Sequence, residues 1–442
     1  MAAALDDVVA FSFVLQPSAH FGAWFSLTEF TEVLPGRNRG IRSCPKHGGV
    51  CQRTRVWKNG AGDFGRLVMH RREIAPRRDW QRCVEDQGLA FHTIDGDLYW
   101  DESAYYEFTS MEIDLLESAT NALQAMCLHA VQHVFDENRM CEFQIPTVMQ
   151  EWVRASWDRD DPSLYGRFDL AYDGVRPPQL LEYNADTPTS LLEAGAIQWF
   201  WLQDVNRRAD QFNSIHEQLL QTWAKFYENC NQPLYFTSVE NHEEDFGNVR
   251  YLQDTAEQAG LRTVYVALEK IAFDLDSQQF LDPSGSPIGT LFKLYPWEWM
   301  LQEEFGRHLP VAPTHWIEPP WKMLLSNKSL LVVMWELFPD SPYLLPAAYT
   351  PMGSSYVCKP CLSREGSNVS IFHGGTQIDG TSGPYVTGPR VYQEYHELPV
   401  FSGNYPVIGS WIVGGEACGL GVREDRSRIT HNMSRFVPHL FF

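Results

Sequence analysis

The stretch Leu181-Glu182-Tyr183-Asn184-Ala185-Asp186 places a carboxylate and an amide two positions apart at the end of an apolar run. On a β-strand, positions i and i+2 lie on the same face, so Glu182 and Asn184 are expected to point in the same direction. Asp169 lies thirteen residues before Glu182, and turn-forming residues separate the two segments. Those residues are Tyr172-Asp173-Gly174 and Pro177-Pro178. We therefore predict a hairpin on which Asp169, Glu182 and Asn184 converge.

These three side chains carry oxygen atoms that suit a hard divalent cation. Two carboxylates and an amide oxygen are ligands that Mg²⁺ accepts. Arg167, two residues before Asp169, offers a planar fork that fits a nucleotide phosphate. A solvated hairpin with ordinary surface carboxylates has the same spacing, so the pattern by itself leaves both interpretations open.

The composition indicates a globular chain without a nucleic-acid partner. The 442 residues suffice for one large or two ordinary domains. The net charge of −21 argues against binding to a phosphate backbone, which requires clustered Lys and Arg. An acidic protein is compatible with a cationic substrate. Nine cysteines without the dense framework of a small secreted domain predict reduced thiols and a cytoplasmic location.

No apolar run approaches the roughly 20 residues that span a bilayer. The apolar residues 194–202, for example, are bracketed by Glu193 and Asp204. The sequence therefore predicts no membrane segment.

Two patterns raise the alternative of a zinc or redox site. Cys358-Lys359-Pro360-Cys361 has C-x-x-C spacing, but a second pair of ligands at suitable spacing is missing. His129 and His133 are four residues apart in a helical pattern, again without a third ligand at recognisable spacing. A plain helix surface is the favoured interpretation of the histidine pair.

The first 68 residues differ in kind from the rest. They carry 8 Lys and Arg against 5 Asp and Glu, whereas the whole chain is strongly acidic. They also lack sustained helical or strand periodicity. We expect a poorly ordered extension or a mis-started segment, with Met69 as a possible start.

The remaining chain alternates helical and strand patterns. Residues 103–140 repeat apolar side chains at helical spacing, which predicts one or two long helices. Residues 190–205 predict a helix with a capping box formed by Ser190 and Glu193. A helix is also expected over residues 214–229, and residues 234–266 predict a β-α-β unit. Beyond Asp340, short β segments with glycine-rich turns are expected.

Several separated motifs together carry a family resemblance. Residues 181–194, which begin with Leu-Glu-Tyr-Asn-Ala-Asp-Thr-Pro-Thr-Ser, resemble the signature of the glutathionylspermidine synthase family. Further matches follow in order: Pro320-Trp321, Ser326-Asn327-Lys328, Lys359-Pro360, Arg364-Glu365-Gly366-Ser367-Asn368, Tyr392-Gln393-Glu394, Leu398-Pro399, Gly414-Gly415 and Gly421-Val422-Arg423-Glu424-Asp425. The similarity covers about residues 69–442 and fits the shorter members, which consist of the synthetase domain alone, without an amidase domain.

The resemblance implies a mixed α+β and α/β architecture. Its core would be an ATP-grasp fold, in which two lobes clamp the nucleotide, with a preceding α/β substrate subdomain and a lid over about residues 326–400. Lys322, beside the motifs but outside them, is expected to be a solvated surface lysine.

The resemblance also implies roles for individual residues. The implied Mg²⁺ ligands are Asp169, Glu182 and Asn184. The implied ATP contacts are Arg167, Lys328, Lys359, Arg364, Gly366, Ser367, Asn368, Gln393, Glu394 and Leu398. The implied catalytic residues are Arg167 and Arg423, and the implied substrate contacts are Asp186, Thr187, Thr189 and Ser190.

The implied reaction is ATP-dependent ligation of a carboxylic acid to an amine. A substrate carboxylate attacks the γ-phosphate to form an acyl phosphate, and an amine then expels phosphate. Glutathione or a related peptide is the expected acid, and a polyamine is the expected amine. Two departures from the bifunctional members, the sequence Thr187-Pro188-Thr189-Ser190 and the residue Glu365, lie near the expected acid site. An ATP-binding regulatory protein without turnover, or a partner-binding protein that has lost nucleotide affinity, is the alternative.

Overall fold

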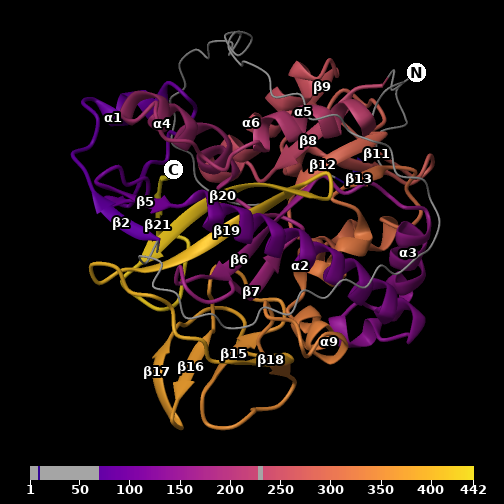
Figure 1. The fold of residues 1–442 in the computed structure, drawn as a ribbon. Helices are drawn as coiled ribbons and strands as arrows, with labels where there is room; N and C mark the ends of the chain where they lie inside the picture. The colour runs from indigo at the N-terminus through magenta and orange to yellow at the C-terminus, as the bar shows by residue number, and fades with distance from the viewer. Residues whose placement is uncertain (1–7, 10–68, 227–231) are drawn as a thin grey trace, which may run out of the picture. The chain divides into compact units, whose positions relative to one another are not determined.

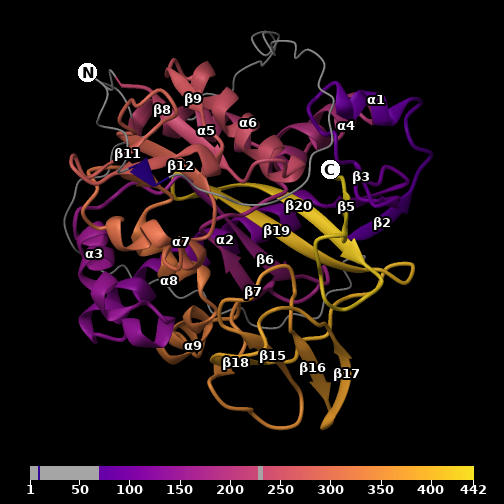
Figure 2. The same ribbon diagram turned by 180° about the vertical axis from the view of Figure 1, so that it is seen from behind.

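The computed structural model describes residues 8–9, 69–226 and 232–442. The expectation of an extension over residues 1–68 therefore lies outside the described residues, apart from strand β1 (Val8–Val9), which pairs with β10 (Ala272–Asp274). Three larger sheets organise the rest (Figures 1 and 2).

A five-stranded antiparallel sheet runs through the middle of the fold (Figure 1). Its strands in spatial order are β21 (Arg435–Val437), β20 (Glu416–Asp425), β19 (Tyr405–Val413), β6 (Tyr165–Ala171) and β7 (Gln179–Asn184). Strands β6 and β7 form the predicted hairpin, in which Asp169 pairs with Glu182 and Arg167 pairs with Asn184. The hairpin prediction is thus confirmed.

Side-chain alternation divides this hairpin into an apolar face and a charged face. Phe168 and Tyr183 stack at a centroid distance of 3.8 Å, and the Tyr183 hydroxyl donates to Gln124 on helix α2 (Ser110–Asp136). Because neighbouring strand residues point to opposite faces, Arg167, Asp169, Glu182 and Asn184 lie on the other side.

The second of the three larger sheets has four parallel strands and lies toward the top of Figures 1 and 2. Its strands are β13 (His315–Ile317), β12 (Thr290–Leu294), β8 (Leu234–Ser238) and β9 (Thr263–Tyr265). Helix α6 (Glu243–Gln258) connects β8 to β9, which confirms the β-α-β unit. Helix α5 (Ile215–Phe226) packs against α6 and confirms the described part of the helix expected over 214–229.

The third sheet confirms the short β segments expected beyond Asp340. Its strands are β14 (Ala347–Ala348), β18 (Arg390–Glu394), β15 (Tyr356–Pro360), β16 (Ser370–His373) and β17 (Thr376–Gly380). Gly374 and Gly375 form the turn between β16 and β17. Helices α8 (Met323–Ser326) and α9 (Ser329–Leu337) precede this sheet, and α9 packs against β14 and β18.

Smaller elements complete the described part of the chain. Strands β2 (His70–Glu73), β5 (Ala104–Phe108) and β22 (His439–Phe441) form one sheet, and β3 (Thr93–Ile94) pairs with β4 (Asp97–Leu98). The remaining strand is β11 (Gln279–Leu281), and the remaining α-helices are α1 (Trp80–Glu85), α3 (Thr147–Asp158), α4 (Gln198–Val205) and α7 (Trp297–Met300). Short 3₁₀-helices span Met140–Phe143, Leu268–Lys270, Glu304–His308 and Pro320–Lys322.

Two helix predictions need correction. Residues 104–108 form strand β5, because their alternating buried side chains pair with β2, and the long helix starts only at Ser110. The capping box expected at Ser190 does not form. Ser190 has φ of +66°, and both its hydroxyl and the Glu193 carboxylate contact the Tyr99 hydroxyl instead. A π-helical segment, Glu193–Ile197, precedes α4.

The expectation that Lys322 is a solvated surface lysine is also wrong, because Lys322 is buried. Its side chain is 1% exposed and pairs with Glu318 at 2.8 Å, while Nζ also donates to the carbonyl of Tyr165. Glu318 in turn accepts the backbone N–H groups of Leu164 and Tyr165. Burial lowers the pKa of Lys322 and raises that of Glu318. The pair fixes the start of β6. Lys322 itself lies four residues before Ser326, the first residue of the motif at 326–328.

Replacing Lys322 with Met should destabilise the protein strongly. The substitution leaves the Glu318 carboxylate buried without its cation, which typically costs about 3–5 kcal/mol. Lys270→Met, which removes an exposed lysine 3.7 Å from Glu240, is the matched control and should change stability little. Urea unfolding followed by far-UV circular dichroism measures both. Equal midpoints for the two variants would contradict the role given to this pair.

Candidate functional site

A cavity of about 420 Å³ lies on the charged face of the β6–β7 hairpin. It is lined by residues from the central sheet, the third sheet and the loops that follow the parallel strands. Most of the predicted site residues line it: Arg167, Asp169, Glu182, Asn184, Thr187, Thr189, Lys328, Lys359, Arg364, Gly366, Gln393, Glu394, Leu398 and Arg423. Asp186, Ser190, Ser367 and Asn368 are not among its lining residues.

Two arginines converge on Asp169. Arg167 Nε donates to Asp169 Oδ1 at 2.7 Å, and its Nη1 donates to the carbonyl of Thr189 at 2.6 Å. Arg423 on β20 also approaches this carboxylate, with Nη2 at 3.6 Å from Asp169 Oδ2. Burial alone would lower the pKa of Arg167, but the Asp169 carboxylate outweighs burial and raises that pKa. The cluster presents two guanidinium groups beside one carboxylate, a combination suited to an oxyanion.

The three predicted metal ligands are neighbours. Asn184 Nδ2 lies 3.2 Å from Asp169 Oδ2 and 3.3 Å from Glu182 Oε1. A carboxamide turned by 180° places its oxygen where this nitrogen stands, next to the two carboxylates. The donor set of two carboxylates and one amide therefore fits a hard divalent cation.

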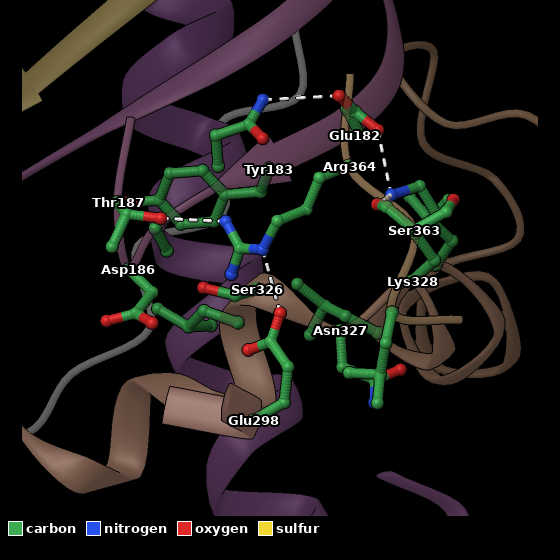
Figure 3. A pocket seen from close by; sticks show the side chains of 16 residues that line it. Glu182, Tyr183, Asp186, Thr187, Glu298, Ser326, Asn327, Lys328, Ser363 and Arg364 are labelled. Atoms are coloured by element: carbon green, nitrogen blue, oxygen red, sulfur yellow. Dashed lines mark hydrogen bonds and ion pairs between the residues drawn. The ribbon is translucent and has the colours of Figure 1, made fainter. Parts of the chain in front are cut away.

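Two lysines face Glu182 from separate elements. Lys328 Nζ lies 3.1 Å from Glu182 Oε2 and donates to the carbonyl of Ser363 at 2.6 Å (Figure 3). Lys359 on β15 donates to the carbonyl of Leu181 and to Gln393, both at 2.8 Å. Burial alone would raise the pKa of Glu182, but Lys328 and Lys359 outweigh it and hold that pKa at about 2.

The pKa of Lys359 is shifted in the opposite direction. Burial lowers it to about 8, against the attraction of Glu182, and the nearby Lys328 lowers it further. The carboxylates near Lys328 and Lys359 do not fully neutralise these two cations. This part of the cavity therefore favours an anionic ligand.

The loop over residues 363–368 approaches the cavity with strained backbone. Glu365, Gly366 and Asn368 all have positive φ. A Cβ on Gly366 would overlap the carbonyl oxygen of Thr430, so only glycine fits. Asn368 accepts the backbone N–H of Tyr385 through Oδ1 at 2.7 Å, which stabilises the loop from behind the cavity.

The loop after β7 divides into cavity contacts and buried supports. The Thr187 hydroxyl accepts from Arg364 Nη1 at 2.7 Å (Figure 3). Asp186 is 1% exposed, and both of its oxygens are engaged: Lys293 donates at 2.6 Å and the backbone N–H of Trp297 at 2.9 Å. Asp186 therefore supports the loop, and it lines a smaller neighbouring pocket (Figure 3) and not the 420 Å³ cavity.

Ser190 also supports this loop from behind. It is 2% exposed and lies 3.0 Å from the Tyr99 hydroxyl, which donates to Glu193 at 2.6 Å. Burial raises the pKa of Glu193 to about 7. Ser190 therefore belongs to a buried hydrogen-bond network with Tyr99 and Glu193.

Part of the cavity lining is apolar. Its apolar side chains fall into two clusters, Leu398, Val407 and Leu181 in one and Val357, Val369, Ile371 and Ile429 in the other. Gln393, which also lines the cavity, accepts from Lys359 and donates to the carbonyl of Leu180. An apolar slot next to two lysines suits a planar base attached to phosphates.

The sequence interpretation missed several residues of the cavity. Trp299, His242 and Asp245 line it, and Glu298 on α7 accepts from Arg364 Nε at 2.8 Å. Burial raises the pKa of Asp245 to about 6, although His242 draws it down. A usable signal existed for α7, because residues 296–299 place a carboxylate between two tryptophans directly after a proline. Asp245 gave no comparable signal.

The alternatives of a zinc or redox site concerned Cys358 with Cys361 and His129 with His133. Among residues 69–226 and 232–442, no group of three or more His, Cys, Asp or Glu side chains is arranged to hold a metal ion. Cys361 is fully buried, burial raises the pKa of its thiol, and Ser329 donates to its sulfur. His129 is exposed on α2, as expected. Within the described residues, no helix is long and apolar enough to cross a membrane.

Comparisons with known proteins find relatives over most of the chain. A family model described as "Glutathionylspermidine synthase preATP-grasp" matches residues 71–442. A Haemophilus influenzae protein named "Putative acid--amine ligase" is 42% identical over 383 residues, which cover 83% of this chain and 97% of that protein.

Longer relatives match over part of their length. The Escherichia coli "Bifunctional glutathionylspermidine synthetase/amidase" is 27% identical over 76% of this chain and 58% of its own length. "Trypanothione synthetase" of Crithidia fasciculata is 28% identical over 69% of this chain and 51% of its own length.

A solved structure supports the fold. A glutathione synthetase-like effector from Globodera pallida superposes with a TM-score of 0.52 at 10% identity, covering 82% of this chain and 96% of that one. The mixed α+β architecture is therefore consistent with an ATP-grasp-like ligase fold. Together with the family match over residues 71–442, these findings establish that the chain belongs to the glutathionylspermidine synthase family and is a ligase.

Proposed function

We propose that the protein is an ATP-dependent ligase that joins a carboxylic acid to an amine through an acyl phosphate. The observation that carries the proposal is the convergence of four cations, Arg167, Arg423, Lys328 and Lys359, on two carboxylates in one cavity. The apolar part of that cavity would receive the adenine near Gln393, Glu394 and Leu398. The central and third sheets would be the two lobes of an ATP-grasp clamp, with the lid within residues 326–400.

The cations would bind the nucleotide phosphates. Lys328 and Lys359 are point charges suited to the α- and β-phosphates, whereas Arg167 and Arg364 have planar forks suited to the terminal phosphate. The backbone of Gly366, Ser367 and Asn368 would approach the phosphates as a lid loop does. Asp169, Glu182 and Asn184 would hold Mg²⁺, which when bound neutralises phosphate charge.

The reaction is a substitution at phosphorus followed by one at carbon. An acid carboxylate oxygen bonds to the γ-phosphorus as the bond to ADP breaks. The amine nitrogen then bonds to the carbonyl carbon, loses a proton, and phosphate leaves. Arg423 would stabilise the oxyanion of the acyl phosphate and of the tetrahedral adduct, because its guanidinium already faces an anionic oxygen.

Glutathione or a related peptide is the proposed acid, and a polyamine is the proposed amine. Thr187 and Thr189 would contact the acid, with Asp186 and Ser190 supporting the loop. The carboxylates of Asp245, Glu365 and Glu394 line the cavity and would favour a cationic amine. We also propose a cytoplasmic location, which six unpaired cysteines in the described chain support.

A regulatory ATP-binding protein of the same fold is the competing proposal. A matrix of acids and amines assayed for ADP release separates the two. Release that requires both an acid and an amine supports the ligase, whereas ATP binding without stimulated release supports the regulator.

Replacing Glu182 with Ala should abolish most of the stabilisation by Mg-ATP. The wild-type protein should gain roughly 2.7 kcal/mol at a hundredfold excess over Kd, and the variant should lose most of that gain. Thermal unfolding with and without Mg-ATP measures it. Glu336→Ala, which removes an exposed partner of Arg139, is the control. An undiminished Mg-ATP shift in the Glu182 variant would exclude Glu182 from the site.

ATP affinity should fall as the pH rises above about 8. The folded pKa of Lys359 is about 8, and phosphate favours the protonated form, so binding at pH 9 must take up a proton. The affinity then falls by up to about tenfold per pH unit. Calorimetry at pH 9 in two buffers of different ionisation enthalpy measures the uptake. Lys359→Arg should abolish it, and unchanged uptake in that variant would contradict the assignment.

Arg423→Ala should lower turnover more than ATP affinity. If Arg423 acts on the acyl phosphate and the adduct, its contacts strengthen as charge develops, and losing such a donor costs about 10²–10³ in kcat. Arg423→Lys should recover little, because an ammonium lacks the planar fork. ADP release and calorimetric ATP affinity are the two measurements. Equal losses in both would assign Arg423 to the nucleotide.

A further inference from the structure

Arg364 is bound to a carboxylate of helix α7. Its Nε donates to Glu298 Oε1 at 2.8 Å, and its Nη1 donates to the Thr187 hydroxyl at 2.7 Å (Figure 3). The guanidinium also lies over the ring of Trp299, 5.9 Å from its centroid. The side chains of Arg364 and Glu298 are 24% and 15% exposed. Such a partly buried pair is stronger than an ordinary surface ion pair.

Glu298 belongs to a firmly held element. Helix α7 begins directly after Pro296, and the backbone N–H of Trp297 donates to Asp186 Oδ2. Lys293, at the end of β12, donates to the other oxygen of Asp186. The Lys293–Asp186 pair is buried, so α7 is fixed to both the parallel sheet and the loop after β7.

The loop that carries Arg364 is held differently. Its other side-chain bonds do not reach α7: Thr381 donates to the carbonyl of Gly366, the backbone of Tyr385 to Asn368, and Lys328 to the carbonyl of Ser363. Arg364 carries the hydrogen bonds that cross to α7 and to Thr187. The position of the loop relative to α7 therefore depends on what the guanidinium binds.

We propose that Glu298 is a positioning residue that acts as a latch. Its carboxylate holds Arg364, and with it residues 363–368, until a nucleotide phosphate displaces it. The inference rests on the proposed function, because it takes a nucleotide as the displacing anion. A carboxylate and a phosphate compete for one guanidinium, since both match its planar fork. Glu298 thus sets an energetic threshold that the nucleotide must exceed before the loop moves.

Glu298→Gln tests the latch. The amide keeps the shape of the side chain but removes the charge that competes with phosphate, so Mg-ATP should bind about tenfold tighter by calorimetry. Without nucleotide, hydrogen exchange of peptides covering residues 363–368 should be faster in the variant than in the wild type. A residue that only supported the fold would weaken ATP binding when altered, so tighter binding is specific to the latch.

Glu303→Gln is the matched control, because Glu303 also accepts a hydrogen bond in this region, from the Tyr295 hydroxyl at 2.7 Å. It should change neither ATP affinity nor loop exchange. If Glu298→Gln folds poorly, Glu298→Asp keeps a carboxylate but falls short of Arg364 Nε, so it weakens the hydrogen bond and should show the same two effects at a smaller size.

Unchanged loop exchange together with unchanged or weaker ATP binding would overturn the latch. A wild-type protein that does not bind Mg-ATP would instead overturn the proposed function. The exchange of residues 363–368 without nucleotide would still decide whether Glu298 holds Arg364.

Discussion

The site depends on the pairing of Asp169 with Arg167 and Arg423. The two guanidinium groups come from strands β6 and β20, which β19 separates. Two guanidinium groups held beside one carboxylate repel each other, and the Asp169 carboxylate offsets that cost. Gly409 of β19 pairs with Asp169, and a Cβ there would overlap the Arg167 side chain. The missing side chain lets Arg167 lie flat along β19.

The reverse face of β20 shows how Arg423 is held in place. The next residue, Glu424, points away from the cavity and is fully buried. It accepts from Arg71 Nε and Nη2 and from Arg435 Nη2 at 2.8 Å, and from the Tyr106 hydroxyl at 2.7 Å. A buried carboxylate with this many charge-assisted bonds tolerates little movement. The precision of the cavity face thus comes from bonds formed behind the sheet.

Much of the hairpin was predictable because it follows from local rules. The two-residue spacing of Glu182 and Asn184 and the turn residues around position 174 required no knowledge of distant segments. Strand β5 was mistaken for helix, because its apolar residues also fit a helical repeat and its pairing with β2 depends on residues thirty positions away. Short apolar runs are ambiguous in this way.

Burial of charge was the feature least accessible from sequence. Lys322 looked like a surface lysine, since nothing near it indicated that Glu318 and the start of β6 would enclose it. The same holds for Lys293 and Asp186, which lie more than a hundred positions apart and meet only in the folded chain. The family motifs indicated which residues gather at the cavity. They did not indicate which face inward and which support the loop.

The close packing of Gly366 affects how mutagenesis of its loop should be interpreted. Its Cα hydrogen occupies the space that any side chain would need, directly against the backbone of Thr430. A substitution there displaces two backbone segments at once, whatever the chemistry of the new side chain. Loss of activity at this position would therefore measure steric exclusion, whereas neighbouring positions such as Ser367 report on polar contacts. Saturation scans of the loop should separate these two causes by position, with glycine alone accepted at residue 366.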